Sequence, residues 1–271
     1  MIVDGEKWTS PFTLERRDMK KQLAAAMTAC VVSVGGATSA LAIEQKVHAA
    51  PVDFRACNFR EGKTMQDLDK VSAKFREYAN ESDVAYAAWT LTPQYHTALG
   101  FDVGWLGAWP DGEAYGVSME KWVTTGREVS AEFNQVIDCS ARHELAISLP
   151  ISAPAGTPED GVLMFYQCTL NDDKSLDTAY EAHLDAGTAM KGLGSLAVSW
   201  MFQPAVGAGD DVDFDYYHVV GFYRYSDMGA TMEMYANGGG RQMQQEILGK
   251  VSSCETPVVF DALIVRAHDE R

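Results

Sequence analysis

Two residues near the C-terminal end have the side chains best suited to acid–base chemistry. His218 and Arg224 are six residues apart in a strand-like segment, and an even spacing places side chains on one face of a β-strand. Histidine exchanges a proton near neutral pH, and arginine binds carboxylates through paired N–H donors. We interpret both as candidate catalytic residues, with Phe222 between them as a ligand contact. The alternative is that each is exposed or paired with one of the chain's many carboxylates.

Tryptophans at matching positions of two similar segments are candidates for ligand binding. Trp89 and Trp200 could form a flat wall against which an aromatic or apolar ligand stacks. They could equally be packing residues of the core, and their presence in both segments favours packing. Two further candidates are Trp105, in a later apolar segment, and His96, which follows a strand-like segment where loops commonly carry function.

Several kinds of chemistry have little support in the sequence. No two histidines have the spacing typical of metal ligands, so no metal site is predicted. Neither a G-x-S-x-G nucleophile motif nor a phosphate-binding loop occurs. The formal net charge of −16 disfavours nucleic acid as a partner, because phosphate binding needs clustered lysine and arginine. Whether the protein is an enzyme stays open at this point.

The N-terminal residues 1–42 are typical of a cleavable export signal. A basic stretch is followed by an apolar run and then by Ala40-Leu41-Ala42, which fits a cleavage site. We predict cleavage after Ala42 and a periplasmic or secreted protein without stable membrane insertion; an uncleaved membrane anchor is the alternative. Residues 1–18 either belong to the signal or are a start-site extension, because Met19 offers a second start.

Rare residues recur along the chain at a constant offset. Cys57 and Cys168 are 111 residues apart, and Trp89 and Trp200 are separated by the same number. Cysteine and tryptophan are rare, so a shared offset indicates two copies of one domain. We assign the copies to residues 52–150 and 161–268, joined by a proline-containing linker over residues 151–160.

Each copy shows the same order of expected elements: a strand, a helix, two strands, a longer helix and a final strand. The longer helix is interrupted by Gly126 in the first copy and by residues 238–240 in the second. In the first copy, Thr64 and Asp67 have the spacing of a capping box at the start of the first helix. The order βαββαβ is ferredoxin-like. The predicted fold class is therefore α+β, with two tandem ferredoxin-like units packed sheet to sheet as a monomeric, pseudo-dimeric α/β barrel.

The four cysteines beyond the export signal are expected to form two disulfides. Three pairings are open from the sequence alone. In the ferredoxin-like topology the end of the first strand meets the start of the last strand. Cys57 and Cys139 occupy these positions in the first copy, and Cys168 and Cys254 occupy them in the second. The topology therefore predicts the bridges Cys57–Cys139 and Cys168–Cys254.

An exported tandem of βαββαβ units with an aromatic second strand resembles the dimeric α/β-barrel superfamily. That group includes NIPSNAP-type, antibiotic-biosynthesis-monooxygenase-like and haem-handling proteins. The segments MEKW and MEMY in the longer helices add to the resemblance, which covers residues 55–267. It implies a ligand pocket between the sheet and its helices or inside the barrel. By this analogy alone, His96, His183 or His218 could bind haem iron; the residues themselves predict no cofactor.

The leading hypothesis is an exported protein that binds a small aromatic or apolar molecule. One alternative is a cofactor-independent enzyme of the monooxygenase-like or isomerase-like kind, with His218 and Arg224 as its polar groups. Another is a haem-binding protein or a purely structural or interaction module. Strong ligand binding without turnover would favour the binding protein. Loss of turnover in a folded His218→Ala variant would favour the enzyme.

Overall fold

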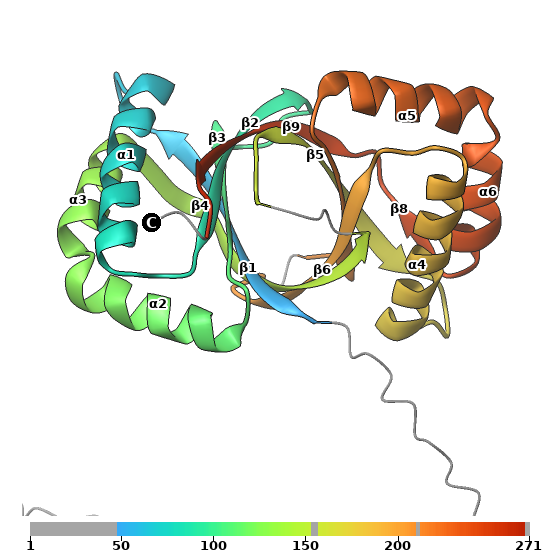
Figure 1. Ribbon diagram of the computed structural model, residues 1–271, viewed down its shortest axis with the longest axis horizontal. Coiled ribbons are helices and arrows are strands. Elements are labelled where there is room, and N and C mark those ends of the chain that lie inside the picture. Colours follow the sequence, from blue (N-terminus) through green and yellow to red (C-terminus); the bar gives the residue numbers. More distant parts are fainter. Residues whose placement is uncertain (1–47, 153–156, 210–211, 269–271) are drawn as a thin grey trace, which may run out of the picture. The chain divides into compact units, whose positions relative to one another are not determined.

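The computed structural model describes residues 48–152, 157–209 and 212–268. The predicted export signal and residues 153–156 of the predicted linker therefore lie outside the described residues. The described part folds into α and β elements in two halves with the same order of elements (Figure 1). The first half runs from residue 50 to residue 152, and the second runs from residue 161 to residue 266.

The first half begins and ends with strands that lie side by side. Strand β1 is antiparallel to both β3 and β4, and β2 is antiparallel to β3. The order across this half is thus β4-β1-β3-β2, as expected for a ferredoxin-like unit. Its elements are β1 (Ala50–Phe59), α1 (Met65–Glu81), β2 (Ala87–Tyr95), β3 (Val103–Ala108), α2 (Gly112–Thr125), α3 (Arg127–Val136) and β4 (Ile137–Ser152).

The second half repeats this arrangement, with the last strand divided in two. Strand β5 pairs with β7, β8 and β9, and β6 pairs with β7. Its elements are β5 (Gly161–Leu170), α4 (Leu176–Gly192), β6 (Val198–Val206), β7 (Tyr216–Phe222), α5 (Tyr225–Asn237), α6 (Gly240–Ile247), the short 3-10 helix Leu248–Lys250, β8 (Ser252–Cys254) and β9 (Val258–Arg266).

Local signals in the sequence explain where the helices begin and end. The Thr64 backbone N–H donates to the Asp67 carboxylate over 3.2 Å, which confirms the predicted capping box before α1. Gly126 separates α2 from α3, as expected. Gly238 ends α5 and Gly239 has a φ of 88°, a left-handed conformation that glycine adopts without a steric penalty.

The two halves join at the edges of their sheets, and their inner faces pack against each other inside the barrel. Between the halves, β2 pairs with β9 and β4 pairs with β6. Within the second half, β5 pairs with β7. The result is one closed antiparallel barrel of eight strands, with β8 as a short addition beside β5 (Figure 1). The expected α/β barrel is therefore confirmed, and the ladders β2–β9 and β4–β6 show how its two sheets are joined. Each edge strand of one half pairs with an edge strand of the other half. Closure of the barrel therefore provides hydrogen-bond partners for their backbone N–H and C=O groups.

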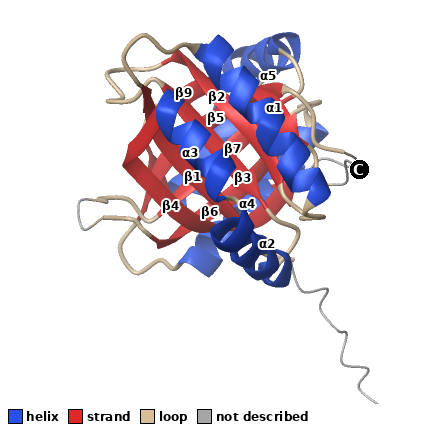
Figure 2. Ribbon diagram, turned by 90° about the vertical axis from the view of Figure 1, so that its left-hand side faces the viewer, coloured by secondary structure: helices blue, strands red, loops and turns tan. Residues whose placement is uncertain are grey.

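The α-helices of the described residues, α1 to α6, lie on the outer surface of the barrel. Helices α1, α2 and α3 cover the strands of the first half, and α4, α5 and α6 cover those of the second (Figures 1 and 2). Each strand therefore has an inner face toward the barrel interior and an outer face toward helices. No helix in the described part of the chain has the length and apolar content needed to cross a bilayer.

Both predicted disulfides are confirmed. Cys57 of β1 is bonded to Cys139 of β4, and Cys168 of β5 is bonded to Cys254 of β8. Each bridge links the first strand of a half to its returning last strand, as the topology requires. Two disulfides are compatible with an oxidising, exported environment.

The barrel interior is filled by aromatic rings at one end. The ring of Phe165 lies 5.6–6.2 Å, centroid to centroid, from four other rings. These rings belong to Phe54, Phe202, Tyr217 and Phe260. The opposite end, where β1 and β5 begin, carries several small side chains alongside Trp89 and Trp200 and is hollow.

Candidate functional site

The molecule has two pockets of interest among the described residues. The first, with a volume of about 150 Å³, lies between the barrel and the helices of the first half. The second, of about 270 Å³, lies inside the barrel at its hollow end. Trp109 lines both pockets. We call them the helix-side pocket and the barrel cavity.

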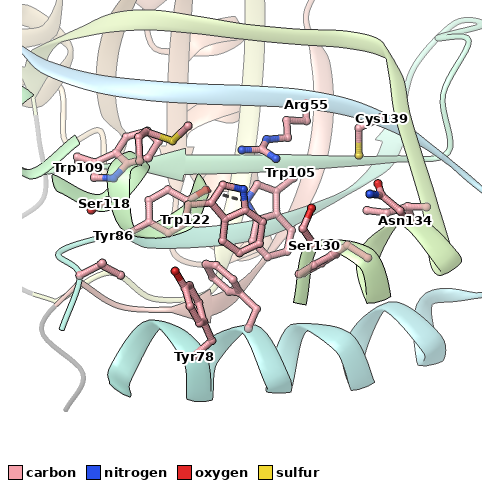
Figure 3. A pocket seen from close by; sticks show the side chains of 15 residues that line it. Arg55, Tyr78, Tyr86, Trp105, Trp109, Ser118, Trp122, Ser130, Asn134 and Cys139 are labelled. Atoms are coloured by element: carbon pink, nitrogen blue, oxygen red, sulfur yellow. Dashed lines mark hydrogen bonds between the residues drawn. The ribbon is translucent and has the colours of Figure 1, made fainter. Parts of the chain in front are cut away.

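Aromatic side chains from several elements form the walls of the helix-side pocket (Figure 3). Phe75 of α1 makes edge contacts with Trp105, Trp122 and Phe133, at ring centroid distances of 5.5, 6.0 and 6.1 Å. Edge-to-face contacts of this kind stabilise aromatic clusters beyond the area they bury. The other lining residues are Arg55, Tyr78, Val84, Tyr86, Trp109, Ser118, Met119, Ser130, Asn134, Ile137 and Cys139.

A short network of polar side chains stands on the strand side of this pocket. The Trp105 indole N–H donates to the Tyr86 hydroxyl over 2.8 Å, and that hydroxyl donates to Asp53 Oδ1 over 3.2 Å. The Arg55 Nε–H donates to Asp53 Oδ2 over 2.9 Å. His143 Nε2 lies 3.6 Å from the same oxygen. Both oxygens of Asp53 are therefore used within the network.

Period-two alternation explains why these groups meet. Asp53 and Arg55 are two residues apart in β1, so both point to the helix side, as does Trp105 of the adjacent β3. Gly107 pairs with Asp53 across the ladder. A Cβ atom at Gly107 would overlap with the Tyr86 hydroxyl and the Asp53 carboxylate. Glycine at this position therefore makes the room in which the network forms.

The network fixes the charge of its members. Burial alone would raise the pKa of Asp53, but the Arg55 charge and hydrogen bonds from His143 and Arg55 outweigh it, so the pKa is lowered. Burial, together with the Asp53 charge, raises the pKa of Tyr86 well above its ordinary value. Burial would lower the pKa of Arg55, yet the Asp53 charge leaves it raised. At neutral pH the site thus holds a carboxylate, a guanidinium and a neutral phenol.

Arg55 keeps donors available to the pocket. It contacts Asp53 only through Nε, and its two terminal amino groups have no hydrogen-bond partner among the described residues. The Arg55 side chain is 27% exposed. In Figure 3 its guanidinium lies above the rings of Trp105 and Trp122. The free edge of the guanidinium can therefore bind an acceptor group in a bidentate manner.

Two buried donors at one end of the helix-side pocket lack partners. Trp109 Nε1 and Ser118 Oγ make no hydrogen bond with any described residue, although both side chains line the pocket. Figure 3 shows the two residues next to each other. Leaving a buried polar group unsatisfied costs about 1–3 kcal/mol. A ligand atom that accepts a hydrogen bond there would recover part of this cost.

The structure distributes the predicted ligand-binding residues over both pockets. Trp105 lines the helix-side pocket, whereas Trp89, Trp200 and Phe222 line the barrel cavity. His96 lies outside both pockets, is exposed, and contacts the Thr97 carbonyl oxygen through Nδ1. The five residues therefore do not form one site.

The prediction that His218 and Arg224 share a sheet face is wrong. Strand β7 ends at Phe222, and Arg224 is the residue that precedes α5. The Arg224 side chain is 72% exposed and forms an ion pair with Asp227 at 2.8 Å. The even spacing had suggested a common face, but the chain leaves the strand between the two residues.

His218 packs instead against a second histidine in the second half. Its ring centroid is 4.3 Å from that of His183 and 5.6 Å from that of Tyr166. His183 Nε2 is 3.0 Å from the Tyr216 hydroxyl, which donates to Ser252 Oγ over 2.7 Å. His183 and His218 are thus parts of the packed layer under α4, and neither lines the two pockets.

Sequence reasoning missed Asp53, Arg55 and Tyr86. A usable signal was present, because Asp53 and Arg55 are a charged pair two residues apart within an otherwise apolar strand. Charged residues are rarely buried unless they are paired. The pattern could therefore have indicated a buried ion pair on the helix side of β1.

Comparison with known proteins identifies the fold. No protein-family model and no curated protein matches the sequence. Among solved structures, the chain is similar to a proposed chlorite dismutase, with a TM-score of 0.50 and 13% identity over 80% of this chain and 96% of the other. It is also similar to a proposed monooxygenase from Lactobacillus acidophilus NCFM, with a TM-score of 0.52 and 9% identity over 81% and 95%. The likeness confirms the expected α/β-barrel fold.

Haem does not fit the residues of either pocket as they stand. Neither pocket is lined by a histidine, and Tyr86 is a neutral phenol that already bonds Asp53. The volumes of 150 and 270 Å³ are also below the roughly 300 Å³ at which pockets for drug-sized ligands begin.

Proposed function

We propose that the protein binds a small aromatic molecule that carries a carboxylate or similar acceptor group. The observation that supports this proposal is the position of Arg55. Its guanidinium stands in a pocket walled by aromatic rings, with both terminal amino groups free of partners among the described residues. An aromatic anion would stack on the rings and take paired hydrogen bonds from the guanidinium.

The volume of the helix-side pocket suits a ligand with one ring. An engineered cavity of about 150 Å³ in another protein binds benzene, and the helix-side pocket has about the same volume. The ring would contact Trp105, Trp122 and Phe75. A second acceptor on the ligand could meet the unpartnered Trp109 and Ser118. A hydroxybenzoate has all of these features.

We further propose that this binding protein is exported and works as a single chain. The predicted signal with cleavage after Ala42, the 52–150 and 161–268 copies and the 151–160 linker support a tandem pseudo-dimer that completes its own barrel. The two disulfides agree with an oxidising compartment. Light scattering on the purified protein tests this proposal, and a monomer is expected.

The decisive experiment compares benzoate with benzylamine, which has the same ring and the opposite charge. Titration calorimetry on the purified protein is expected to show binding of benzoate and at least tenfold weaker binding of benzylamine. The Arg55→Met variant is expected to lose at least tenfold in benzoate affinity, because hydrogen bonds to a charged group contribute about 1.5–3 kcal/mol.

The control is Arg142→Met. Arg142 pairs with the buried Glu144 at 2.8 Å, just as Arg55 pairs with Asp53, but it lines neither pocket. Both variants leave a buried carboxylate without its arginine, so both lose stability for the same reason. Equal benzoate affinity in the two variants, or no benzoate binding by the unaltered protein, would contradict the proposal.

The other hypotheses have less support. An enzyme that uses His218 and Arg224 together would need them in one site, whereas Arg224 is exposed on another element. A haem protein would need an axial ligand in a pocket that lacks histidine. A visible absorption spectrum of the purified protein tests for bound haem, and a Soret band would favour the haem hypothesis.

A further inference from the structure

The barrel cavity is a second enclosed space with its own chemistry. It lies where β1 and β5 begin, at the end of the barrel that the Phe165 cluster leaves unfilled. Small residues on six strands keep it open. These are Ala50, Ala108, Ser148, Gly161, Gly221 and Ala262.

Two indoles form the larger walls of this cavity. Trp89 and Trp200 are the third residues of β2 and β6, one from each half. The Trp89 Nε1–H donates over 3.0 Å to the carbonyl oxygen of Glu159. Trp200 makes no hydrogen bond with any described residue, and the buried Trp109, which also lines the cavity, has an unpartnered Nε1. The walls therefore offer flat apolar faces to a ligand.

The mouth of the barrel cavity is acidic. Glu159 and Asp160 are exposed at its edge, and the described residues that line it include no lysine, arginine or histidine. The Asp160 carboxylate also accepts a hydrogen bond of 2.7 Å from the Ile264 backbone N–H, which fixes its position. An anion would meet two negative charges here, whereas a cation would be attracted.

We propose that the barrel cavity binds a flat aromatic amine with about two fused rings, with its ammonium group at the mouth beside Glu159 and Asp160. Benzene occupies a cavity of about 150 Å³, so a volume of 270 Å³ corresponds to roughly twice that ligand. The two rings stack against Trp89 and Trp200. This site shares only Trp109 with the helix-side pocket and has the opposite charge preference, so the proposal does not depend on the proposed function.

The test uses 1-naphthylmethylamine and its charge-reversed counterpart 1-naphthoate. Calorimetry at low salt is expected to show saturable binding of the amine and at least tenfold weaker binding of the naphthoate. Ala108→Leu fills the cavity and is expected to reduce amine affinity at least tenfold. Glu159→Gln, on an exposed side chain that tolerates change, is expected to reduce it about threefold, since exposed charges are partly screened.

Arg55→Met is the matched control, because Arg55 lines only the helix-side pocket. This variant is expected to bind the amine as the unaltered protein does. In the unaltered protein, the indole N–H signal of Trp200 in a nitrogen–proton NMR spectrum is expected to shift when the amine binds. This measurement does not require Ala108→Leu to fold. Absence of saturable amine binding, a larger loss in Arg55→Met than in Ala108→Leu, or an unmoved Trp200 signal would overturn the proposal.

Discussion

The imidazole of His183 is 1% exposed and His218 packs against it. Burial lowers the pKa of His183 to about 4. Burial, and then the nearby His183, lower the pKa of His218 well below its ordinary value. Both rings are therefore neutral at pH 7. In the unfolded chain each would take up a proton near pH 6.5, so acid favours unfolding.

We expect the free energy of unfolding to fall as the pH drops from about 6.5 to about 4. Each histidine that protonates only on unfolding contributes a slope of up to about 1.4 kcal/mol per pH unit. His183→Gln should make this slope shallower by up to that amount. Urea unfolding at several pH values measures it. Gly116→Ala adds no titratable group, and its Cβ atom meets nothing within 4 Å, so it should leave the slope unchanged. An equal change in both variants would contradict the assignment.

Single residues were also where sequence reasoning was least reliable. The spacing of His218 and Arg224 suggested a shared face, but spacing decides orientation only while a strand continues. The sequence did not identify Arg55 as a pocket residue, because the pocket also depends on Trp122 and Phe133 from helices far along the chain. The spacing of Asp53 and Arg55 could indicate a buried ion pair, but no local pattern predicts the pocket that several elements assemble around it.

At the scale of the element, β3 depends on Gly107 for its fit against β1 and β2. The side chain of Asp53 and the ring of Tyr86 occupy the space that a Cβ atom would need. Overpacking of this kind usually costs about 1–3 kcal/mol.

We therefore expect Gly107→Ala to lower the free energy of unfolding by about 1–3 kcal/mol and to weaken benzoate binding, because Arg55 would lose its fixed partner. Urea unfolding and calorimetry measure the two effects. Gly116→Ala in α2 is the control, since a Cβ atom there meets nothing within 4 Å. Equal stability of the two variants would show that Gly107 has no such role.

The elements themselves were largely predictable. Helices and strands follow from periodicity and caps in short stretches of sequence, as the Thr64–Asp67 cap of α1 illustrates. Both disulfides followed from the order of elements. The pairing of β2 with β9 and of β4 with β6 could not be predicted, because the sequence of an edge strand does not specify which other strand it pairs with.

At the scale of the whole molecule, the two halves complete one barrel. In the full chain β2 pairs with β9, which is the last long strand of the other half, and β4 pairs with β6. A first half on its own could satisfy both edges by pairing its β2 with the β4 of a second copy.

We therefore expect residues 48–152, produced alone under oxidising conditions, to form a homodimer. Light scattering after size-exclusion chromatography measures the mass, and circular dichroism reports whether the half is folded. The full chain, measured in parallel, is the comparison and should be monomeric. A folded, monomeric first half would show that the inter-half ladders are dispensable.

Closure of the sheet also bears on how the protein behaves in concentrated solution. Each of the eight barrel strands has a neighbour on both sides, so among the described residues no long strand offers a free ladder to another molecule. Exposed strand edges are the usual starting points of cross-β aggregation. The folded barrel removes these starting points, and self-association through β-pairing must begin with the breaking of a ladder that already exists.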